Sequence, residues 1–211
     1  MDLNRQPVET KQSSRIESFS DNIFAIALTL LVLTIKVPLL PTDGEPGFLA
    51  NYLLSQWPAY LTYVVSFLTV LLMWINHHTM FQRVQKADHS LMFLNGLMLL
   101  PVTLVSFPTS LLAVFISHPQ ARYAAAIFAG SFVLIAGLYC LVWAYITRMN
   151  KRLGVEEDEP RIHRLTKKIR LVFALYVGAF CLAFVYPLAC IGACFLLAIY
   201  LALPELRNTA E

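Results

Sequence analysis

Long, nearly uncharged apolar stretches follow one another along the chain and are separated by shorter polar segments. A helix needs about 20 predominantly apolar residues to cross the hydrocarbon of a bilayer, and few helices of soluble proteins carry so many. The pattern predicts six spans, at residues 16–38, 52–81, 91–116, 121–146, 169–185 and 188–203. We therefore expect an all-α, polytopic membrane protein in which residues 1–211 form a single six-span domain.

The polar segments between these stretches define the expected connections. Residues 1–14 are polar and should form a short flexible leader. Pro101 and Pro108 lie inside the third apolar stretch, and because proline disrupts the helical hydrogen bonds, that helix should be kinked or broken. The longest polar segment, residues 147–168, should be a solvated loop with a helical lead into the fifth span.

Composition and charge support this class and give an orientation. The chain of 211 residues is 58% hydrophobic and 14% charged, with a mean hydropathy of +0.63, beyond what a soluble domain needs. Six spans place 14 of the 16 Lys and Arg residues on one side, leaving Lys36 and Arg122 on the other. Because short cytoplasmic loops are rich in Lys and Arg, we expect a multi-pass protein of the cell (plasma) membrane with both termini cytoplasmic. The basic loop could also be a patch for anionic lipids, but topology signalling explains it without further function.

Several classes of chemistry find no support in the sequence. No HExxH, GxSxG or DxD-type arrangement is present, and no acid and base are paired inside the spans, so we do not expect an enzyme. The four cysteines lie in apolar segments without a CxxC pair, and the neighbouring His77 and His78 point about 100° apart on a helix, so neither a metal nor a cofactor is expected. Nothing indicates binding of nucleic acid or of a small-molecule substrate.

The first span has two chemically different sides. Ile26, Leu30 and Leu33 are spaced i, i+4 and i+7 and form a narrow apolar stripe. Asn22 and Thr29 flank this stripe, whereas the helical period places Asp21 about 140° from Ile26. An acidic residue is costly in lipid, so Asp21 should face protein or water. The stripe itself could line a pore or could simply pack against other helices.

A polar cluster at the start of the first span should meet a second cluster at the end of the second span. In the six-span topology both lie at the cytoplasmic side and at similar depth; their members are Arg15, Ser20 and Asp21 in the first cluster and Trp74, Asn76, His77 and His78 in the second. A buried carboxylate needs donors, which these side chains can supply. The contact could be a structural staple within one subunit, or a proton site or pH-sensitive switch.

The motif Arg15-x-x-x-Phe19-Ser20-Asp21 resembles that of the transmembrane protein 175 family of potassium channels. The resemblance continues over the whole six-span layout, and its further motifs are Trp74-x-x-His77-His78-x-x-Phe81, Leu94-Asn95-Gly96-Leu97 and Phe107-Pro108-Thr109. It implies a cation channel without a TVGYG filter, a string that this chain indeed lacks. A single six-span copy is similar to the prokaryotic members, which assemble as tetramers, so the expected partners are further copies of the chain and the lipid bilayer.

The resemblance also implies roles for individual residues. The apolar constriction of a potassium-selective, leak-like pore would be Ile26, Leu30 and Leu33, with Thr29 and Asn22 as the polar groups beside it, and K⁺ as the permeant ion. A network of motif residues would fix the pore helix: Arg15, Phe19, Ser20, Asp21, Trp74, His77 and Asn95. The alternative is a proton-conducting channel or a proton-coupled secondary transporter, in which Asp21 and His77 relay protons.

Overall fold

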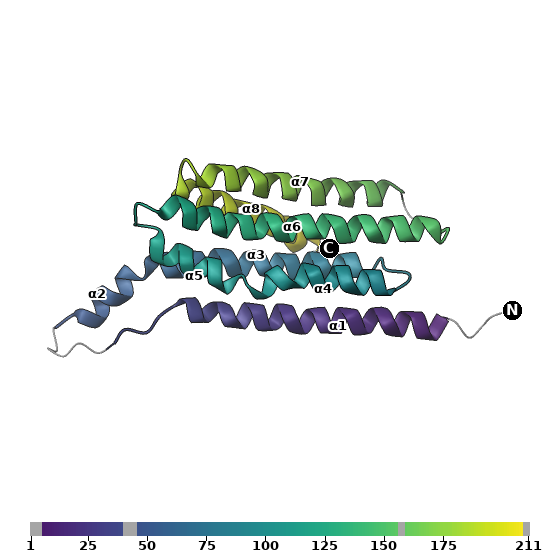
Figure 1. Cartoon of the computed structure of the whole chain (residues 1–211), viewed down its shortest axis with the longest axis horizontal. Helices are drawn as coiled ribbons and strands as arrows, with labels where there is room; N and C mark the ends of the chain where they lie inside the picture. The colour runs from purple at the N-terminus through teal and green to yellow at the C-terminus, as the bar shows by residue number, and fades with distance from the viewer. Residues whose placement is uncertain (1–5, 40–45, 156–158, 209–211) are drawn as a thin grey trace.

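The computed structural model describes residues 6–39, 46–155 and 159–208, and the side chains of residues 14–39, 46–155 and 159–201. Over these ranges the chain is helical, and most helices run along one long axis (Figure 1). The elements are α1 (Gln6–Leu30), the 3₁₀ turn η1 (Leu31–Thr34), α2 (Phe48–Ser55), α3 (Trp57–Phe81), α4 (His89–Thr103), α5 (Ser106–Phe115), α6 (Ala121–Arg152), α7 (Glu159–Ala183) and α8 (Pro187–Asn208). The all-α class predicted from the sequence is therefore confirmed.

Four helical segments of the described chain are long and apolar enough to cross a membrane: Ser14–Thr34, Trp57–Phe81, His89–Phe115 and Ala121–Arg152. They correspond to the first four predicted spans. The apolar part of α8, Pro187–Leu201, is shorter, and α7 carries basic residues as far as Arg170. By length and composition the fifth and sixth spans thus fall short of the first four.

The first helix differs from its prediction at both ends. It already begins at Gln6, so the expected flexible leader is largely helical. This extension has a simple cause, since Gln, Glu and Lys have good helix propensity once the apolar part of the helix exists. The helix ends at Thr34 through the turn η1, and Ile35 is extended. The predicted helix end at residue 38 was wrong; Pro38 disfavours helical geometry at Val37, and the helix ends before it reaches that residue.

The second and third apolar stretches are both interrupted. The second breaks at Gln56, because Pro58 has no backbone N–H and is accommodated only in the first turn of α3. The predicted continuous helix over 52–81 was therefore wrong at its start. In the third stretch the predicted break is confirmed. It lies at Leu104–Val105, between Pro101 and Pro108, where Val105 N–H bonds the carbonyl of Val102.

The polar segment 147–168 is mostly helical, not the predicted loop. Helix α6 continues to Arg152 and ends in a paired arrangement in which Gly154 N–H bonds Lys151 O and Val155 N–H bonds Asn150 O. Gly154 adopts a φ of 68°, which favours glycine at this position. The next helix already begins at Glu159, so the expected helical lead into the fifth span is confirmed.

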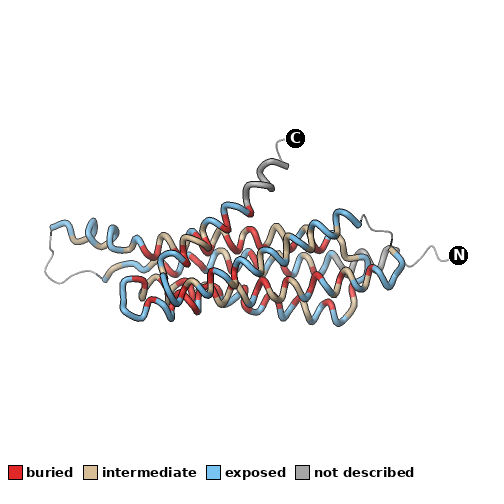
Figure 2. Tube along the Cα trace, turned by 90° about the horizontal axis from the view of Figure 1, so that it is seen from above, coloured by how far each residue is buried: buried red, intermediate tan, exposed pale blue. Residues whose placement is uncertain are grey.

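The bundle is layered, with α1 and α7 at opposite edges and α3 to α6 between them (Figure 1). Buried residues follow the centre of the bundle (Figure 2), where Phe128, Phe132 and Ile135 of α6 are inaccessible to solvent. The start of α1, the end of α3, the start of α4, the end of α6 and the start of α7 share one end of the molecule. Between residues 15 and 170, every Lys and Arg except Lys36 and Arg122 belongs to that end.

Candidate functional site

Helix α1 packs against the bundle along one face only. This face consists of Ile16, Ser20, Phe24, Ala27 and Leu31, each 6% exposed or less. Their spacing of three or four residues is that of a single helical face. The contacts are made with α3 and α4, and at η1 also with α5. One side of α1 is therefore anchored within the subunit.

The opposite face of α1 is left uncovered by the rest of the chain. Ile26, Leu30 and Leu33 are 57%, 41% and 70% exposed. The polar residues predicted beside them, Asn22 and Thr29, are exposed as well. The Thr29 hydroxyl donates to the Ile26 carbonyl at 2.8 Å, so its oxygen lone pairs remain available on the exposed face. The structure thus brings the predicted constriction and its flanking polar groups together in one strip.

The carboxylate of Asp21 turns toward α3. Its Oδ1 accepts a hydrogen bond of 2.8 Å from Nε1 of Trp74. One turn earlier on α1, Glu17 lies 2.6 Å from Nδ1 of His78. The two acidic residues of α1 in this region therefore both contact the end of α3 and not the exposed strip. Glu17 is absent from the predicted set, although its spacing of four residues from Asp21 places it on the same side of the helix.

A buried chain of hydrogen bonds joins α1, α4 and α3. Nδ2 of Asn95 donates to Oγ of Ser20 at 2.9 Å, and Oδ1 of Asn95 lies 3.0 Å from Nε2 of His77. Because Oδ1 can only accept, Nε2 of His77 carries the proton in this arrangement. Ser20 and His77 are fully buried and Asn95 is 1% exposed. Water cannot reach these groups, so the hydrogen bonds between them compensate for the hydration that they lose on folding.

Aromatic rings enclose His77 on several sides. Its ring stacks on Phe81 at a centroid distance of 4.2 Å and lies 5.5 Å from Phe24 and 6.4 Å from Tyr139. The Tyr139 hydroxyl donates to the Met73 carbonyl and ties α6 to α3. Sequence reasoning missed the roles of Phe24 and Tyr139, since an aromatic residue in an apolar span carries no signal of its partner. Within the described residues, Nδ1 of His77 has no hydrogen-bond partner.

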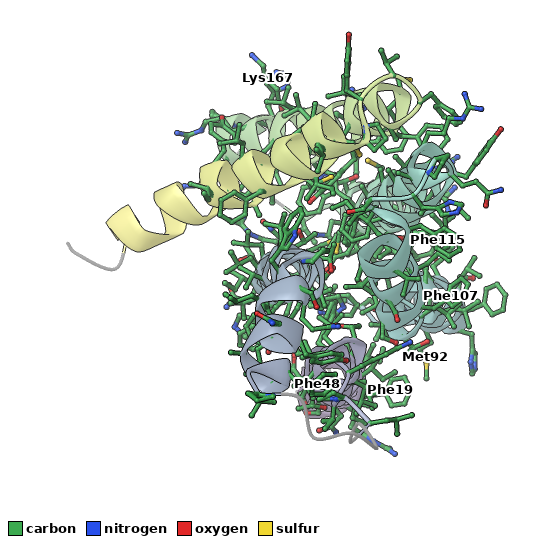
Figure 3. All side chains as sticks on the ribbon, turned by 90° about the vertical axis from the view of Figure 1, so that its left-hand side faces the viewer. Phe19, Phe48, Met92, Phe107, Phe115 and Lys167 are labelled. Carbon is green, nitrogen blue, oxygen red and sulfur yellow. The ribbon has the colours of Figure 1, made fainter. Side chains whose placement is uncertain are left out.

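Two residues of the predicted network lie outside these contacts. Arg15 and Phe19 are exposed, and Phe19 stands at the edge of the bundle far from Lys167 (Figure 3). Both line an open cavity of about 540 Å³, together with Ile16, Ala87, Asp88, His89, Met92 and Asn95. The first-helix motif is therefore divided. Ser20 and Asp21 contact neighbouring helices of the same subunit, whereas Arg15 and Phe19 face outward.

The network residues fall inside a stretch that matches a known family. A family model described as endosomal/lysosomal potassium channel TMEM175 matches residues 15–106. A potassium channel of Chamaesiphon minutus is 44% identical over 195 residues, which cover 92% of this chain and 96% of that protein. The chain belongs to the TMEM175 family. The family consists of channels, so the expectation that the protein is not an enzyme is confirmed.

Solved structures agree with this assignment. The crystal structure of a lysosomal potassium-selective channel TMEM175 homolog from Chamaesiphon minutus superposes with a TM-score of 0.82, at 44% identity, over 92% of this chain and 98% of that one. A crystal structure of a variant of the potassium channel MtTMEM175 shares the fold, with a TM-score of 0.60 at 19% identity and 93% coverage of both chains.

An animal relative is similar over a shorter stretch. The human endosomal/lysosomal proton channel TMEM175 is 38% identical over 96 residues, which are 43% of this chain and 19% of that protein. The relatives of the present chain are thus named for two different permeant ions, K⁺ and the proton.

Proposed function

We propose that this TMEM175 protein is a potassium-selective, leak-like channel, formed by four copies whose α1 helices surround a common pore. The observation that carries the proposal is the uncovered strip of α1. Ile26, Leu30 and Leu33 are exposed on a helix whose other face is anchored in the subunit. The close relative named as a potassium channel covers nearly the whole chain and supports the same ion.

The chemistry of the strip favours a pore over a surface for lipid. Asn22 and Thr29 lie on the strip and are exposed, and polar side chains in membrane helices usually face protein or water. From Ile26 to Leu33 the helix rises about 10 Å, so four copies would form a short apolar constriction. Such a constriction gates by dewetting and admits ions that shed water readily, which favours K⁺ over Na⁺. This arrangement would replace the carbonyl filter of other potassium channels.

The proposal includes six spans with both termini at the cytoplasmic side of the cell membrane. The gathering of cationic residues at one end of the bundle supports this orientation. Among the Lys and Arg residues from 15 to 170, Lys36 and Arg122 are the two at the other end. In this topology α7 and α8 complete the single domain as its fifth and sixth spans.

Planar-bilayer recording of the purified protein tests the constriction. Under a potassium gradient the wild type should give single-channel currents that reverse near the K⁺ equilibrium potential. We expect Ile26→Asn and Leu30→Ala to raise the open probability or conductance and to move the reversal potential in mixed K⁺/Na⁺ toward zero, because both changes admit water to the constriction. Leu134→Asn is the matched control, since Leu134 of α6 is 56% exposed, like Ile26, but lies outside the strip. Unchanged currents in both strip variants would show that the strip is not the constriction.

Proton conduction, in a channel or in a proton-coupled carrier, is the second candidate. Two observations favour it: the animal relatives named as proton channels, and the buried His77, whose Nδ1 lacks a partner within the described residues. A pH gradient at symmetrical K⁺ separates the candidates. A proton channel would show a reversal potential that follows pH, and a proton-coupled carrier would show fixed coupling of K⁺ and proton flux. A potassium channel would show neither.

A further inference from the structure

An open groove of about 860 Å³ separates the end of α6 from the start of α7. Four cationic side chains line it, Arg148 and Lys151 from α6 and Lys167 and Arg170 from α7, while Glu159 is the one carboxylate among the described lining residues. Four positive charges and one negative charge leave a net charge of +3. Within the described part of the chain none of the four cations forms an ion pair, so the described lining of the groove carries an excess of positive charge.

The groove lies where the two helices pass from apolar to polar sequence. The apolar stretch of α6 ends at Ile146, just before Arg148, and that of α7 begins at Leu171, just after Arg170. If both helices cross the bilayer, these cations lie at the depth of the lipid phosphates. Leu171 and Leu175 follow Lys167 at intervals of four residues and are 45% and 41% exposed. They offer an apolar surface next to the cations, on the side of the apolar stretch of α7.

A hydrogen bond joins α6 to α7 beside the groove. Nε1 of Trp143 on α6 donates to Oγ1 of Thr166 on α7 at 2.8 Å, and the Thr166 hydroxyl in turn donates to the Ile162 carbonyl at 2.8 Å. Thr147, Thr166 and Arg170 line both the groove and a smaller adjoining cavity of about 120 Å³. Because this bond joins α6 to α7, the helix segments that carry the four cations stay next to each other, whereas the side chains themselves can adapt to a ligand.

The groove is on the side of the bundle that the proposed pore leaves to lipid. Helix α7 lies at the edge opposite α1 (Figure 1), and Lys167 points away from the bundle (Figure 3). This step rests on the proposed function, since α1 at the pore axis places α7 at the periphery of the assembly.

We propose that the α6–α7 groove binds the phosphate headgroup of an anionic phospholipid of the cytoplasmic leaflet, with its acyl chains on Leu171 and Leu175. Topology signalling needs only basic residues near the membrane, and Arg161 and Arg164 of α7 would serve it equally well. Neither of these residues lines the groove. The proposal therefore differs from topology signalling by predicting that the groove cations bind lipid and that the other two do not.

The test is lipid binding to the purified full-length protein in neutral detergent, measured as the shift in unfolding temperature on titration with phosphatidylglycerol or phosphatidylcholine. We expect phosphatidylglycerol alone to stabilise the wild type. Lys167→Gln/Arg170→Gln should weaken its apparent affinity by about 30-fold, or about fivefold per cation. The matched control, Arg161→Gln/Arg164→Gln, removes the same charge from the same helix and should retain the affinity within about twofold.

Two results would overturn the proposal. Equal weakening in both double variants would show a general electrostatic effect, and equal stabilisation by inorganic phosphate would show a site for a free anion. If Lys167→Gln/Arg170→Gln elutes as aggregate, Arg148→Gln/Lys151→Gln tests the α6 side of the same groove. Because binding is read without current, a channel that conducts but ignores phosphatidylglycerol rejects only the lipid site. Specific lipid binding by a protein that does not conduct rejects only the channel.

Discussion

The indole N–H of Trp74 on α3 donates a hydrogen bond to the carboxylate of Asp21 on α1. This bond holds the carboxylate away from the exposed strip that carries Ile26. The proposed channel places two requirements on α1. One face must be held by its own subunit, and the other must remain uncovered until further copies assemble. Together with the contact between Glu17 and His78, the Asp21–Trp74 bond ties α1 to the end of α3, and a carboxylate acceptor forms stronger hydrogen bonds than a neutral one.

Trp74→Phe is predicted to destabilise the subunit by about 1–2 kcal/mol, since it keeps most of the ring but leaves the Asp21 carboxylate without its indole donor. Trp57→Phe is the matched control, because Trp57 of the same helix is 49% exposed and has no hydrogen bond among the described contacts. Unfolding temperature in detergent measures the effect. Equal temperatures for the two variants would contradict the role of the Asp21–Trp74 bond.

Asp21→Ala is predicted to impair assembly more than conduction. Without the carboxylate, α1 loses its bond to Trp74 and can shift against α3. Size-exclusion chromatography in detergent should show a reduced tetramer peak. An intact tetramer whose currents respond differently to pH would instead assign Asp21 to a proton pathway.

Ser20 and Ser18 offer a direct comparison within α1. Both hydroxyls donate to the carbonyl four residues earlier, Ser20 to Ile16 and Ser18 to Ser14. Only Ser20 also accepts a bond from Asn95. Ser20→Ala should therefore cost about 1–3 kcal/mol, because the buried amide of Asn95 is left without an acceptor, and Ser18→Ala should be nearly neutral. Thermal unfolding measures both, and a similar loss in the two variants would show that the bond from Asn95 contributes little.

The division of α1 into two faces could be predicted from the sequence, because it depends only on helical periodicity. The same periodicity placed Asp21 about 140° from Ile26, and the six-span topology placed the end of the second span at the same depth as Asp21. The sequence did not identify Trp74 among Trp74, Asn76, His77 and His78, since the choice depends on the rotation of α3 against α1. The spacing of residues within one helix does not determine how that helix is rotated against its neighbour.

Other features depend on long-range packing and could not be predicted. The Tyr139 hydroxyl donates to the carbonyl of Met73, 66 residues away in the chain, and nothing local distinguishes Tyr139 from the other aromatic residues of the apolar stretches. The helical extension of α1 to Gln6 was missed because a polar segment is compatible with a loop and with a solvated helix alike. The break at Gln56, by contrast, has a local cause in Pro58 and was within reach of the sequence.

Asp88 is predicted to make the stability of the α3–α4 connection sensitive to acid. It caps α4 by accepting from Leu91 N–H at 2.8 Å, and it also accepts from the Tyr145 hydroxyl. Burial alone would raise the pKa of this carboxyl, but the bonds from Tyr145 and Leu91, with smaller contributions from its own amide and from Lys86, outweigh it, so the pKa of Asp88 is lowered.

Because the folded pKa lies below the unfolded value of about 3.9, this stabilisation is complete above that value and is lost as the pH falls through the lowered pKa of Asp88. Asp88→Asn should remove this part of the acid sensitivity and lower the stability at neutral pH. Unfolding temperatures between pH 3 and pH 7 test both statements. If Asp88→Asn and the wild type have the same unfolding temperatures over this pH range, Asp88 does not have this capping role.

Thr29 gives the sharpest test of selectivity at the proposed constriction. Its hydroxyl donates to the carbonyl three residues earlier, as does that of Thr34, which donates to Leu31 at 2.8 Å. The two differ in position, since Thr29 is exposed on the strip and Thr34 is 4% exposed. Thr29→Val keeps the shape and removes the oxygen that an ion in the pore would meet. We expect a loss of K⁺ over Na⁺ selectivity of about fivefold or more, about 1 kcal/mol, read from reversal potentials in mixed ions. Thr34→Val should retain the selectivity, so equal selectivity in both variants would place the discriminating group elsewhere.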